Sequence, residues 1–150
     1  MDKFDNTKDK YECIKLENQL CFSLYALSRE IIRLYKPFLD KYNLTYTQYL
    51  TMIVIWENDG INIKEIGNRL HLDSGTLTPV IKKLEAMNLI TKHRDTNDDR
   101  VVIVELTENG KVLREEVLNV PELVSCQLGL TKEEFDTLKV PIEKLLNRFI

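Results

Sequence analysis

The sequence predicts a mainly α fold with one small β element, of the α+β kind. Three observations lead to it: a long helical repeat of apolar residues near the start, two short helical segments around a polar turn in the middle, and a change to a β period after Leu89. With 150 residues, of which 43% are hydrophobic and 30% charged, the chain suits one soluble globular domain with a real core.

The N-terminal helix is predicted over residues 16–38 from two parallel stripes of side chains. In the first stripe the gaps are 4, 4, 3, 4, 3 and 4: Leu16, Leu20, Leu24, Leu27, Ile31, Leu34 and Phe38. The second stripe contains Cys21, Tyr25, Ser28, Ile32 and Tyr35. Both spacings are typical of a helix face. Because the two stripes together are wider than one core contact needs, we expect one stripe to pack inside the subunit and the other against a partner chain.

The middle of the chain predicts a helix-turn-helix. A preceding helix is capped by Thr45 and runs to about Trp56, with these inward side chains: Tyr49, Leu50, Ile53 and Val54. After the turn signal NDG, the segment INIKEIGNRLHL predicts a short helix. The segment DSGTLTPVIKKLEAMNLI predicts the next one, with Asp73 or Ser74 as its N-cap. Two such helices around a tight polar turn form a helix-turn-helix motif.

A β-hairpin is predicted directly after this motif. The runs LITKHR and RVVIVEL flank the polar tip DTNDD, and the second run is β-branched with alternation. A hairpin with basic residues that follows a helix-turn-helix makes a winged helix. The predicted fold is therefore a winged helix-turn-helix with long N- and C-terminal helices.

Two further helices are predicted after the hairpin. The segment TENGKVLREEVL predicts a helix that ends before Pro121, and Thr131 with Glu134 forms a capping box for a last helix over roughly 132–149. Pro141 is expected to bend or break that last helix. We expect residues 1–150 to form a single domain. The dimerisation helices would lie at about 14–44 and 107–149, around a winged-helix lobe at about 45–106.

Charge and cysteine content narrow the class of protein. The net charge of −3 argues against a protein that binds nucleic acid over its whole surface, but it does not exclude a local basic face. We find no apolar run long enough to span a bilayer, and MDKFDNTKDK lacks the apolar core of a signal peptide, so a cytoplasmic protein is expected. The three cysteines are too scattered for a disulfide scaffold or a zinc site, and neither a metal nor a cofactor is predicted.

Five segments carry a family resemblance: LENQLCF, SREIIRLYKP, LTYTQYL, LDSGTLTP and DDRVV. Together with Tyr25 they resemble the MarR family of bacterial winged-helix repressors, and within it the organic-hydroperoxide-sensing (OhrR-like) branch. The resemblance covers about residues 14–149. It implies a homodimeric repressor rather than an enzyme, which binds a palindromic double-stranded DNA operator and responds to organic hydroperoxide.

The second helix of a helix-turn-helix enters the major groove with its N-terminal residues leading. The residues expected there are Asp73, Ser74, Gly75, Thr76, Thr78 and Pro79. Lys82 and Lys83 lie a turn further on and suit phosphate contacts. In the wing, the basic residues around the tip are Lys92, His93, Arg94 and Arg100. The resemblance implies that Arg100 reaches the minor groove and that Asp98 holds it in place.

Cys21 is the expected redox sensor. A thiolate near a helix N-terminus is stabilised modestly by the helix dipole, and Tyr25, four residues on, could donate its phenolic hydrogen to the sulfur. Tyr35 lies 14 residues from Cys21, which is roughly 21 Å along one helix, so it cannot reach that sulfur within a straight helix. The resemblance implies that Tyr35 comes from the partner subunit.

Cys126 is the candidate resolving cysteine. OhrR-like proteins with a second cysteine in the C-terminal third form an intersubunit disulfide, whereas those with one reactive cysteine form mixed disulfides with small thiols. Cys126 follows Pro121 in PELVSCQLGL, where we expect a loop between two helices. An incidental loop thiol is the alternative, and Cys13 has no matching role.

Three other interpretations stay open. Cys21 could be a small buried hydrophobe, with both tyrosines as interface packing. The chain could be a MarR-type repressor that binds a small aromatic ligand, its cysteines being bystanders. It could also be a thiol peroxidase, although it lacks the alternating βαβ pattern of a thioredoxin-like fold.

Overall fold

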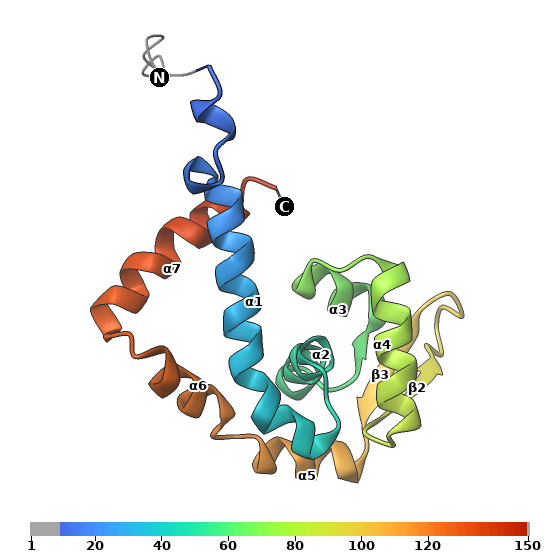
Figure 1. Cartoon of the computed structure of the whole chain (residues 1–150). Coiled ribbons are helices and arrows are strands. Elements are labelled where there is room, and N and C mark those ends of the chain that lie inside the picture. Colours follow the sequence, from blue (N-terminus) through green and yellow to red (C-terminus); the bar gives the residue numbers. More distant parts are fainter. Residues whose placement is uncertain (1–9, 150) are drawn as a thin grey trace.

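The computed structural model describes residues 10–149 (Figure 1). In chain order, with η for short 3₁₀ helices, the elements are η1 (Glu12–Ile14), η2 (Leu16–Asn18), α1 (Leu20–Leu39), η3 (Asp40–Tyr42), α2 (Tyr46–Glu57), β1 (Ile61–Asn62), α3 (Ile63–Leu70), α4 (Ser74–Ala86), β2 (Ile90–Arg94), β3 (Val102–Leu106), α5 (Glu108–Glu116), α6 (Val120–Leu128) and α7 (Lys132–Leu146). The predicted mainly α fold with a small antiparallel sheet is confirmed. Residues 1–9 lie outside the described residues, so the absence of a signal peptide there stays a prediction.

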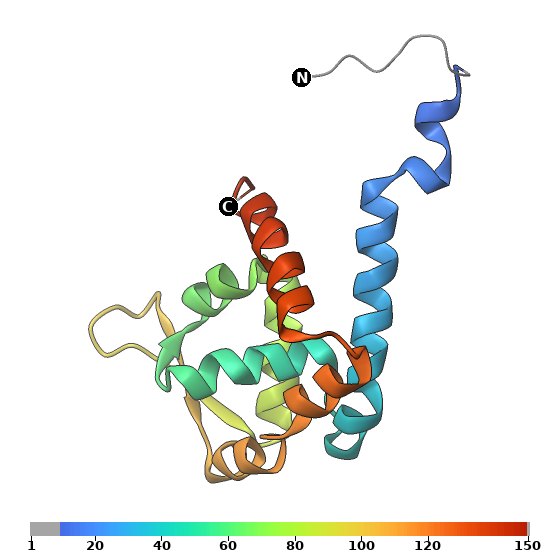
Figure 2. The same cartoon turned by 90° about the vertical axis from the view of Figure 1, so that its left-hand side faces the viewer.

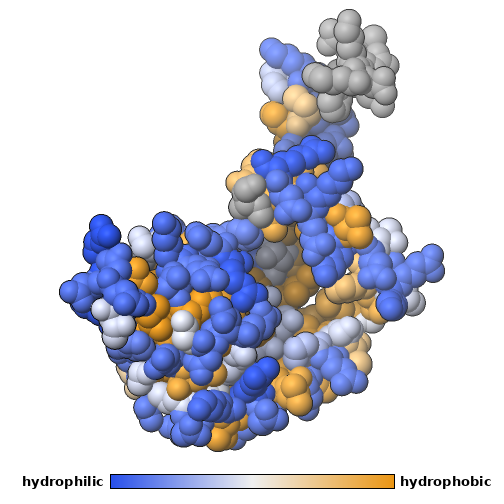
Figure 3. Space-filling model, turned by 180° about the vertical axis from the view of Figure 1, so that it is seen from behind, coloured by the Kyte–Doolittle hydropathy of each residue, from blue (hydrophilic) through white to orange (hydrophobic). Residues whose placement is uncertain are grey.

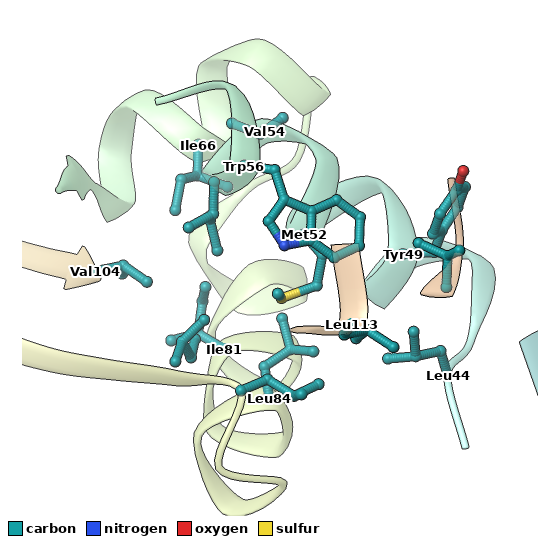
Figure 4. Packing of buried hydrophobic residues seen from close by; sticks show 14 of the residues in the cluster. Leu44, Tyr49, Met52, Val54, Trp56, Ile66, Ile81, Leu84, Val104 and Leu113 are labelled. Carbon is teal, nitrogen blue, oxygen red and sulfur yellow. The ribbon is translucent and has the colours of Figure 1, made fainter. Parts of the chain in front are cut away.

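Helix α2 runs through the middle of the hydrophobic core. Met52 and Ile55 are fully buried, and Figure 4 shows Met52 beside Trp56 and above side chains from α4. The cap at Thr45 is confirmed as a capping box. Tyr49 and Val54 are buried as predicted, and Ile53 is half-buried and packs against the core, whereas Leu50 is only half-buried. Helix α2 is in contact with α1, α3, α4, α5 and β3. Side chains on several of its faces are therefore buried, and not only those of one stripe.

The sheet has three strands in the order β1-β3-β2, all antiparallel. The predicted hairpin is confirmed, with Ile90 opposite Leu106 and Arg94 opposite Val102. The third strand was missed, because its two residues were assigned to the following helix. Ile61 pairs with Val104, a fully buried residue of β3, which closes one edge of the hairpin over the core.

The wing and α5 are fixed to α2 by a buried hydrogen bond. The Trp56 indole N–H donates to the carbonyl oxygen of Gly110, with 2.8 Å between nitrogen and oxygen. A side chain at position 110 would place its Cβ 2.1 Å from the Leu89 carbonyl oxygen, so only glycine permits this close approach. The start of β2, the start of α5 and the end of α2 therefore form one packed unit.

The N-terminal helix begins later than predicted. It starts at Leu20 rather than Leu16, after the two 3₁₀ turns η1 and η2. The backbone is extended at Gln19, and its side-chain amide donates to the Cys13 carbonyl oxygen at 2.7 Å. Asn18 likewise donates to the carbonyl oxygen of Glu12 at 2.9 Å. These side-chain bonds stabilise the 3₁₀ turns in place of a longer α-helix.

The N-terminal half of α1 and helix α7 stand out from the rest of the molecule, whereas the C-terminal half of α1 packs against the core. Figures 1 and 2 together show the N-terminal half of α1 projecting upward, with α7 apart from it. In the single chain described, Leu39 is the one buried residue of α1, and α7 has none. The capping box at Thr131 is confirmed. Of the two expected effects of Pro141, a break is excluded, because α7 continues through it to Leu146, while a bend stays a prediction.

Within residues 10–149 we find no helix that is both long and apolar enough to cross a membrane.

Candidate functional site

The N-terminus of α4 is capped by Asp73, which settles the choice between Asp73 and Ser74. The Asp73 carboxylate accepts from the backbone N–H of Thr76 at 2.9 Å and from the Thr76 hydroxyl at 3.1 Å. These hydrogen bonds from Thr76 lower the pKa of the Asp73 carboxyl. The carboxylate is therefore used inside the turn, where it orients the start of the helix.

The two threonines of α4 use their hydroxyl hydrogens within the helix. Thr78 donates to the Ser74 carbonyl oxygen at 2.6 Å, and Thr76 donates to Asp73. The parts of both side chains left for a ligand are the oxygen lone pairs and the methyl group. Pro79 is exposed beside them and has no N–H for the usual helical bond to Gly75. The whole predicted set at the start of α4 is solvent-facing: Asp73, Ser74, Gly75, Thr76, Thr78 and Pro79.

The wing holds Arg100 in a defined orientation. Its Nε and Nη2 donate to the two carboxylate oxygens of Asp98 at 3.0 and 3.1 Å, and its backbone N–H donates to the same group at 3.0 Å. This pairing lowers the pKa of the Asp98 carboxyl and raises that of Arg100. The Arg100 side chain is 90% exposed, so its guanidinium keeps a free side that faces solvent.

The remaining basic residues differ in how freely they face solvent. Lys92 pairs with Glu85 of α4 at 2.7 Å, and Arg94 donates to the backbone carbonyl oxygen of Asp99. Lys82 and Lys83 are exposed on α4, and no ion pair to either is found within residues 10–149. His93 Nδ1 lies 3.8 Å from a Glu105 carboxylate oxygen. The lysines of α4 are therefore better placed for a negatively charged ligand than Lys92 is.

Cys21 occupies the second position of α1 and is exposed. The late start of the helix at Leu20 places it in the first turn, where backbone N–H groups lack helical partners. The positive end of the helix dipole acts most strongly in this turn and favours an anion. The alternative interpretation, in which Cys21 is a small buried hydrophobe, does not fit the single chain.

Tyr25 lies one turn after Cys21 and is 60% exposed. Its hydroxyl oxygen is 3.5 Å from Arg29 Nη1, and the Arg29 guanidinium lies 5.5 Å from the ring centre. Among the described residues, no hydrogen bond joins Tyr25 to Cys21. In the single chain the structure thus brings Tyr25 to Arg29 and not to the sulfur.

Tyr35 lies on the same continuous helix as Cys21, so the distance argument stands for this chain. Its ring packs against Tyr46 and Tyr49 of α2, with ring centres 4.8 and 5.9 Å away. Burial raises the pKa of all three tyrosines, that of Tyr49 to about 12. Tyr35 is therefore held by its own lobe as a neutral hydrogen-bond donor.

Cys126 lies within a helix, and the expectation of a loop was wrong. Pro121 stands in the first turn of α6, where a missing N–H costs nothing, and the helix continues to Leu128. Val124 is buried against the rest of the chain, while Cys126 is exposed on the other side. Cys13 is also exposed, in η1. In the described residues no group of three or more His, Cys, Asp or Glu side chains is arranged to hold a metal.

Three comparisons with known proteins agree on one family. The family described as transcriptional regulator SarA/Rot matches residues 33–117. The organic hydroperoxide resistance transcriptional regulator of Bacillus subtilis is 47% identical over 132 residues, which cover 88% of each chain. Reduced AbfR bound to DNA matches with a TM-score of 0.77 and 35% identity, covering 94% of this chain and 98% of that one. Disulfide-formed AbfR matches with a TM-score of 0.63, at 35% identity, covering 91% and 96%; AbfR comes from Staphylococcus epidermidis.

The chain belongs to the MarR family of transcriptional regulators. Its similarity to the hydroperoxide regulator confirms the OhrR-like resemblance. The relatives of this MarR-family chain are transcriptional regulators and not enzymes, which confirms that it is not an enzyme and rejects the thiol peroxidase interpretation.

Three contacts in this MarR-family chain were missed by sequence reasoning. Arg29 continues the stripe of Cys21 and Tyr25 at the same spacing of four, a signal that was present in the sequence. Tyr46 packs on Tyr35, and Glu85 neutralises Lys92, but both contacts join different elements. No local pattern reveals such pairs, because they depend on how α1 packs on α2 and how α4 packs on the wing.

Proposed function

We propose that this chain is a homodimeric repressor that releases its DNA operator when organic hydroperoxide oxidises Cys21. The observation that carries the proposal is the place of Cys21, exposed in the first turn of a helix whose sides are largely uncovered. A sulfur in that position combines access for an oxidant with the free backbone N–H groups of a helix start. The similarity to a regulator of organic hydroperoxide resistance supports the choice of oxidant.

The dimer is inferred from helices that a single chain leaves bare. Helix α7 carries an apolar stripe with gaps of 3, 4 and 4 whose residues are 44–48% exposed: Phe135, Leu138, Ile142 and Leu146. Amphipathic helices in proteins are stabilised mainly by packing of such a face. Figure 3 shows hydrophobic side chains gathered in the hollow beside the α1 arm. We assign a second copy as their cover, with about residues 14–44 and 107–149 as dimerisation helices around the lobe at 45–106.

In the dimer, each α4 would enter a major groove of a palindromic operator. The two helices would lie about one DNA turn apart. Thr76 and Thr78 would accept hydrogen bonds from base amino groups, or contact a thymine methyl, because their hydrogens are already used. Lys82 and Lys83 would contact phosphates, and Arg100, held by Asp98, would reach the minor groove. The structure of a related regulator bound to DNA supports this mode.

Oxidation would proceed by attack of the Cys21 thiolate on the outer oxygen of the hydroperoxide. The O–O bond breaks as the S–O bond forms, and the departing alkoxide takes a proton to become an alcohol. The sulfur loses two electrons and becomes a sulfenic acid. Tyr35 of the partner subunit is the proposed donor to this sulfur, since Tyr35 of the same chain lies roughly 21 Å away along α1.

A disulfide is the proposed second step. The sulfenic acid condenses with the thiol of Cys126 from the partner subunit, or with a small thiol, and water leaves. A disulfide needs Cα atoms within about 7 Å of each other, so α6 would have to approach the N-terminus of the opposite α1. That approach would move the two lobes, so that the distance between the two α4 helices would no longer match the spacing of the operator half-sites. The structure of a related regulator, disulfide-formed AbfR, supports a disulfide as the second step.

The redox proposal is tested with Cys21→Ser, using Cys13→Ser as the matched control. Binding of operator DNA is measured by fluorescence anisotropy with and without cumene hydroperoxide. We expect hydroperoxide to release wild type and Cys13→Ser from DNA, while Cys21→Ser stays bound. Release of Cys21→Ser by hydroperoxide would refute the proposal, and release of all three by an aromatic acid alone would favour the ligand-binding repressor.

The route after oxidation is tested by non-reducing electrophoresis. We expect a dimer-sized band after hydroperoxide treatment, which Cys126→Ser removes and Cys13→Ser keeps. A band that persists in Cys126→Ser excludes Cys126 as the resolving residue. If wild type forms no such band but gains the mass of an added small thiol, the mixed-disulfide route is correct.

A further inference from the structure

Arg29 completes a column of three side chains on one face of α1. It lies one turn after Tyr25 and two turns after Cys21. Side chains on an α-helix lean toward its N-terminus, so each member of such a column covers the turn before it. Arg29 contacts Tyr25 at both the hydroxyl oxygen, 3.5 Å away, and the ring face, 5.5 Å from its centre.

The direction of the hydrogen bond in this column follows from chemistry. A guanidinium group has only donors, so the Tyr25 oxygen must accept from Arg29. The phenol then has one hydrogen of its own left to donate. Cys21 lies one turn toward the helix N-terminus, and its sulfur, which is not bonded to Tyr25 in the single chain described, would accept this hydrogen as a thiolate before oxidation and as a sulfenate after it.

The charge of Arg29 is free to act on the phenol. Its neighbours on α1 are paired with carboxylates: Arg33 with Glu30 at 3.0 Å and Lys36 with Asp40 at 2.8 Å. Within the part of the chain that is described, no carboxylate pairs with Arg29. A hydroxyl that accepts from a cation becomes a stronger donor, because hydrogen bonds in a chain polarise one another.

We propose that Arg29 is a positioning residue of the sensor site, where its guanidinium fixes Tyr25 as a hydrogen-bond donor to the Cys21 sulfur. This inference rests on the proposed redox function and assigns a role within the same site. Arg29 itself does not touch the reacting atoms. It acts through Tyr25, on the orientation and strength of one hydrogen bond.

The test uses the full chain with Cys13→Ser and Cys126→Ser, so that Cys21 is the single thiol. Its rate of alkylation by iodoacetamide is measured against pH, because only the thiolate reacts. We expect Arg29→Met to move the midpoint of this profile up by roughly half a pH unit or more, and Arg29→Lys to move it less. Arg33→Met removes a matched cation one turn away and leaves the midpoint in place.

A double variant separates a role through Tyr25 from a general charge effect. Tyr25→Phe should shift the midpoint as Arg29→Met does, and the two changes together should add little further. Equal midpoints in Arg29→Met and Arg33→Met, or full additivity with Tyr25→Phe, would overturn the inference. If the parent protein's Cys21 does not react with cumene hydroperoxide, the proposed function fails instead, since alkylation tests Arg29 without any hydroperoxide.

Discussion

The winged-helix lobe and the two projecting helices are built on opposite principles. In the lobe, α2 is surrounded by other elements, and side chains such as Met52 and Ile55 have no exposed surface. Helices α1 and α7 contribute one buried residue between them in the chain described, namely Leu39. The lobe therefore has its core within one chain, whereas the projecting helices leave their apolar faces open to the partner that we propose.

This division also separates the two chemical tasks. The residues proposed to bind DNA lie on α4 and the wing, which are held by the lobe core and by fixed pairs such as Asp98–Arg100. The thiol proposed to be oxidised lies on the uncovered part of α1, at Cys21. Tyr35 connects the two regions, because it belongs to α1 and its ring packs against Tyr46 and Tyr49 of the lobe. In the proposed dimer, a change at the partner's sulfur would therefore reach the lobe through Tyr35.

The largest expected effect comes from breaking the core of the lobe. Ile55→Ala removes a fully buried side chain, and we expect it to lower the free energy of unfolding by about 3 kcal/mol, measured by urea denaturation. Ile14→Ala makes the same change at a residue that is 70% exposed, and should stay within about 0.5 kcal/mol of wild type. Similar losses in both variants would mean that the N-terminal turns share the core of the lobe.

The next prediction tests whether α7 is covered by a second copy. Leu138→Glu puts a charge in the middle of its apolar stripe. We expect the dissociation constant of the dimer, measured by sedimentation equilibrium, to rise roughly 30-fold, which corresponds to about 2 kcal/mol. Val140→Glu lies off that stripe on the same helix, is 63% exposed, and serves as the matched control with no expected change. Equal effects of the two variants would place the partner contact elsewhere.

Sequence reasoning succeeded where the signal is local. The capping boxes at Thr45 and Thr131 follow from a Thr with a Gln or Glu three residues later, and both are present. The Asp98–Arg100 pair, two residues apart, agrees with the family resemblance. Such features depend on neighbours along the chain, so a single sequence contains them.

The failures share a different cause. The start of α1 depends on side chains that reach back six residues, from Asn18 and Gln19, and helical periodicity cannot register such bonds. Pro121 was read as a stop, yet in α6 it stands at the start, so the helix around Cys126 was taken for a loop. Strand β1 exists because Ile61 meets Val104, a contact set by packing across the lobe. The pairing of Lys92 with Glu85 is of the same kind.

The buried tyrosines of the lobe predict that the folded protein loses stability at alkaline pH. The pKa of Tyr49 is raised to about 12 in the folded protein from an ordinary value of 10.0, so the unfolded chain loses this proton first. Stability should therefore fall between pH 10 and 12, by up to about 2 kcal/mol from Tyr49. Urea denaturation across this range should show a shallower decline in Tyr49→Phe than in wild type. An unchanged decline in Tyr49→Phe would exclude Tyr49 as its source.

The smallest expected effect comes from removing the threonine of a capping box. The chain has one such box in each region, at the start of α2 and at the start of α7. Thr45→Ala and Thr131→Ala each remove a side-chain acceptor at a helix start, which costs about 1 kcal/mol. In α2 the helix is part of the core, so Thr45→Ala should lower the free energy of global unfolding by that amount. In α7 no residue is buried in the single chain, so Thr131→Ala should instead speed amide hydrogen exchange along α7 while the amides of α2 keep their protection. Hydrogen exchange read by mass spectrometry measures both helices in one experiment. Equal loss of protection in α2 after either substitution would show that α7 unfolds together with the lobe, and the division between a self-sufficient lobe and partner-dependent helices would then be wrong.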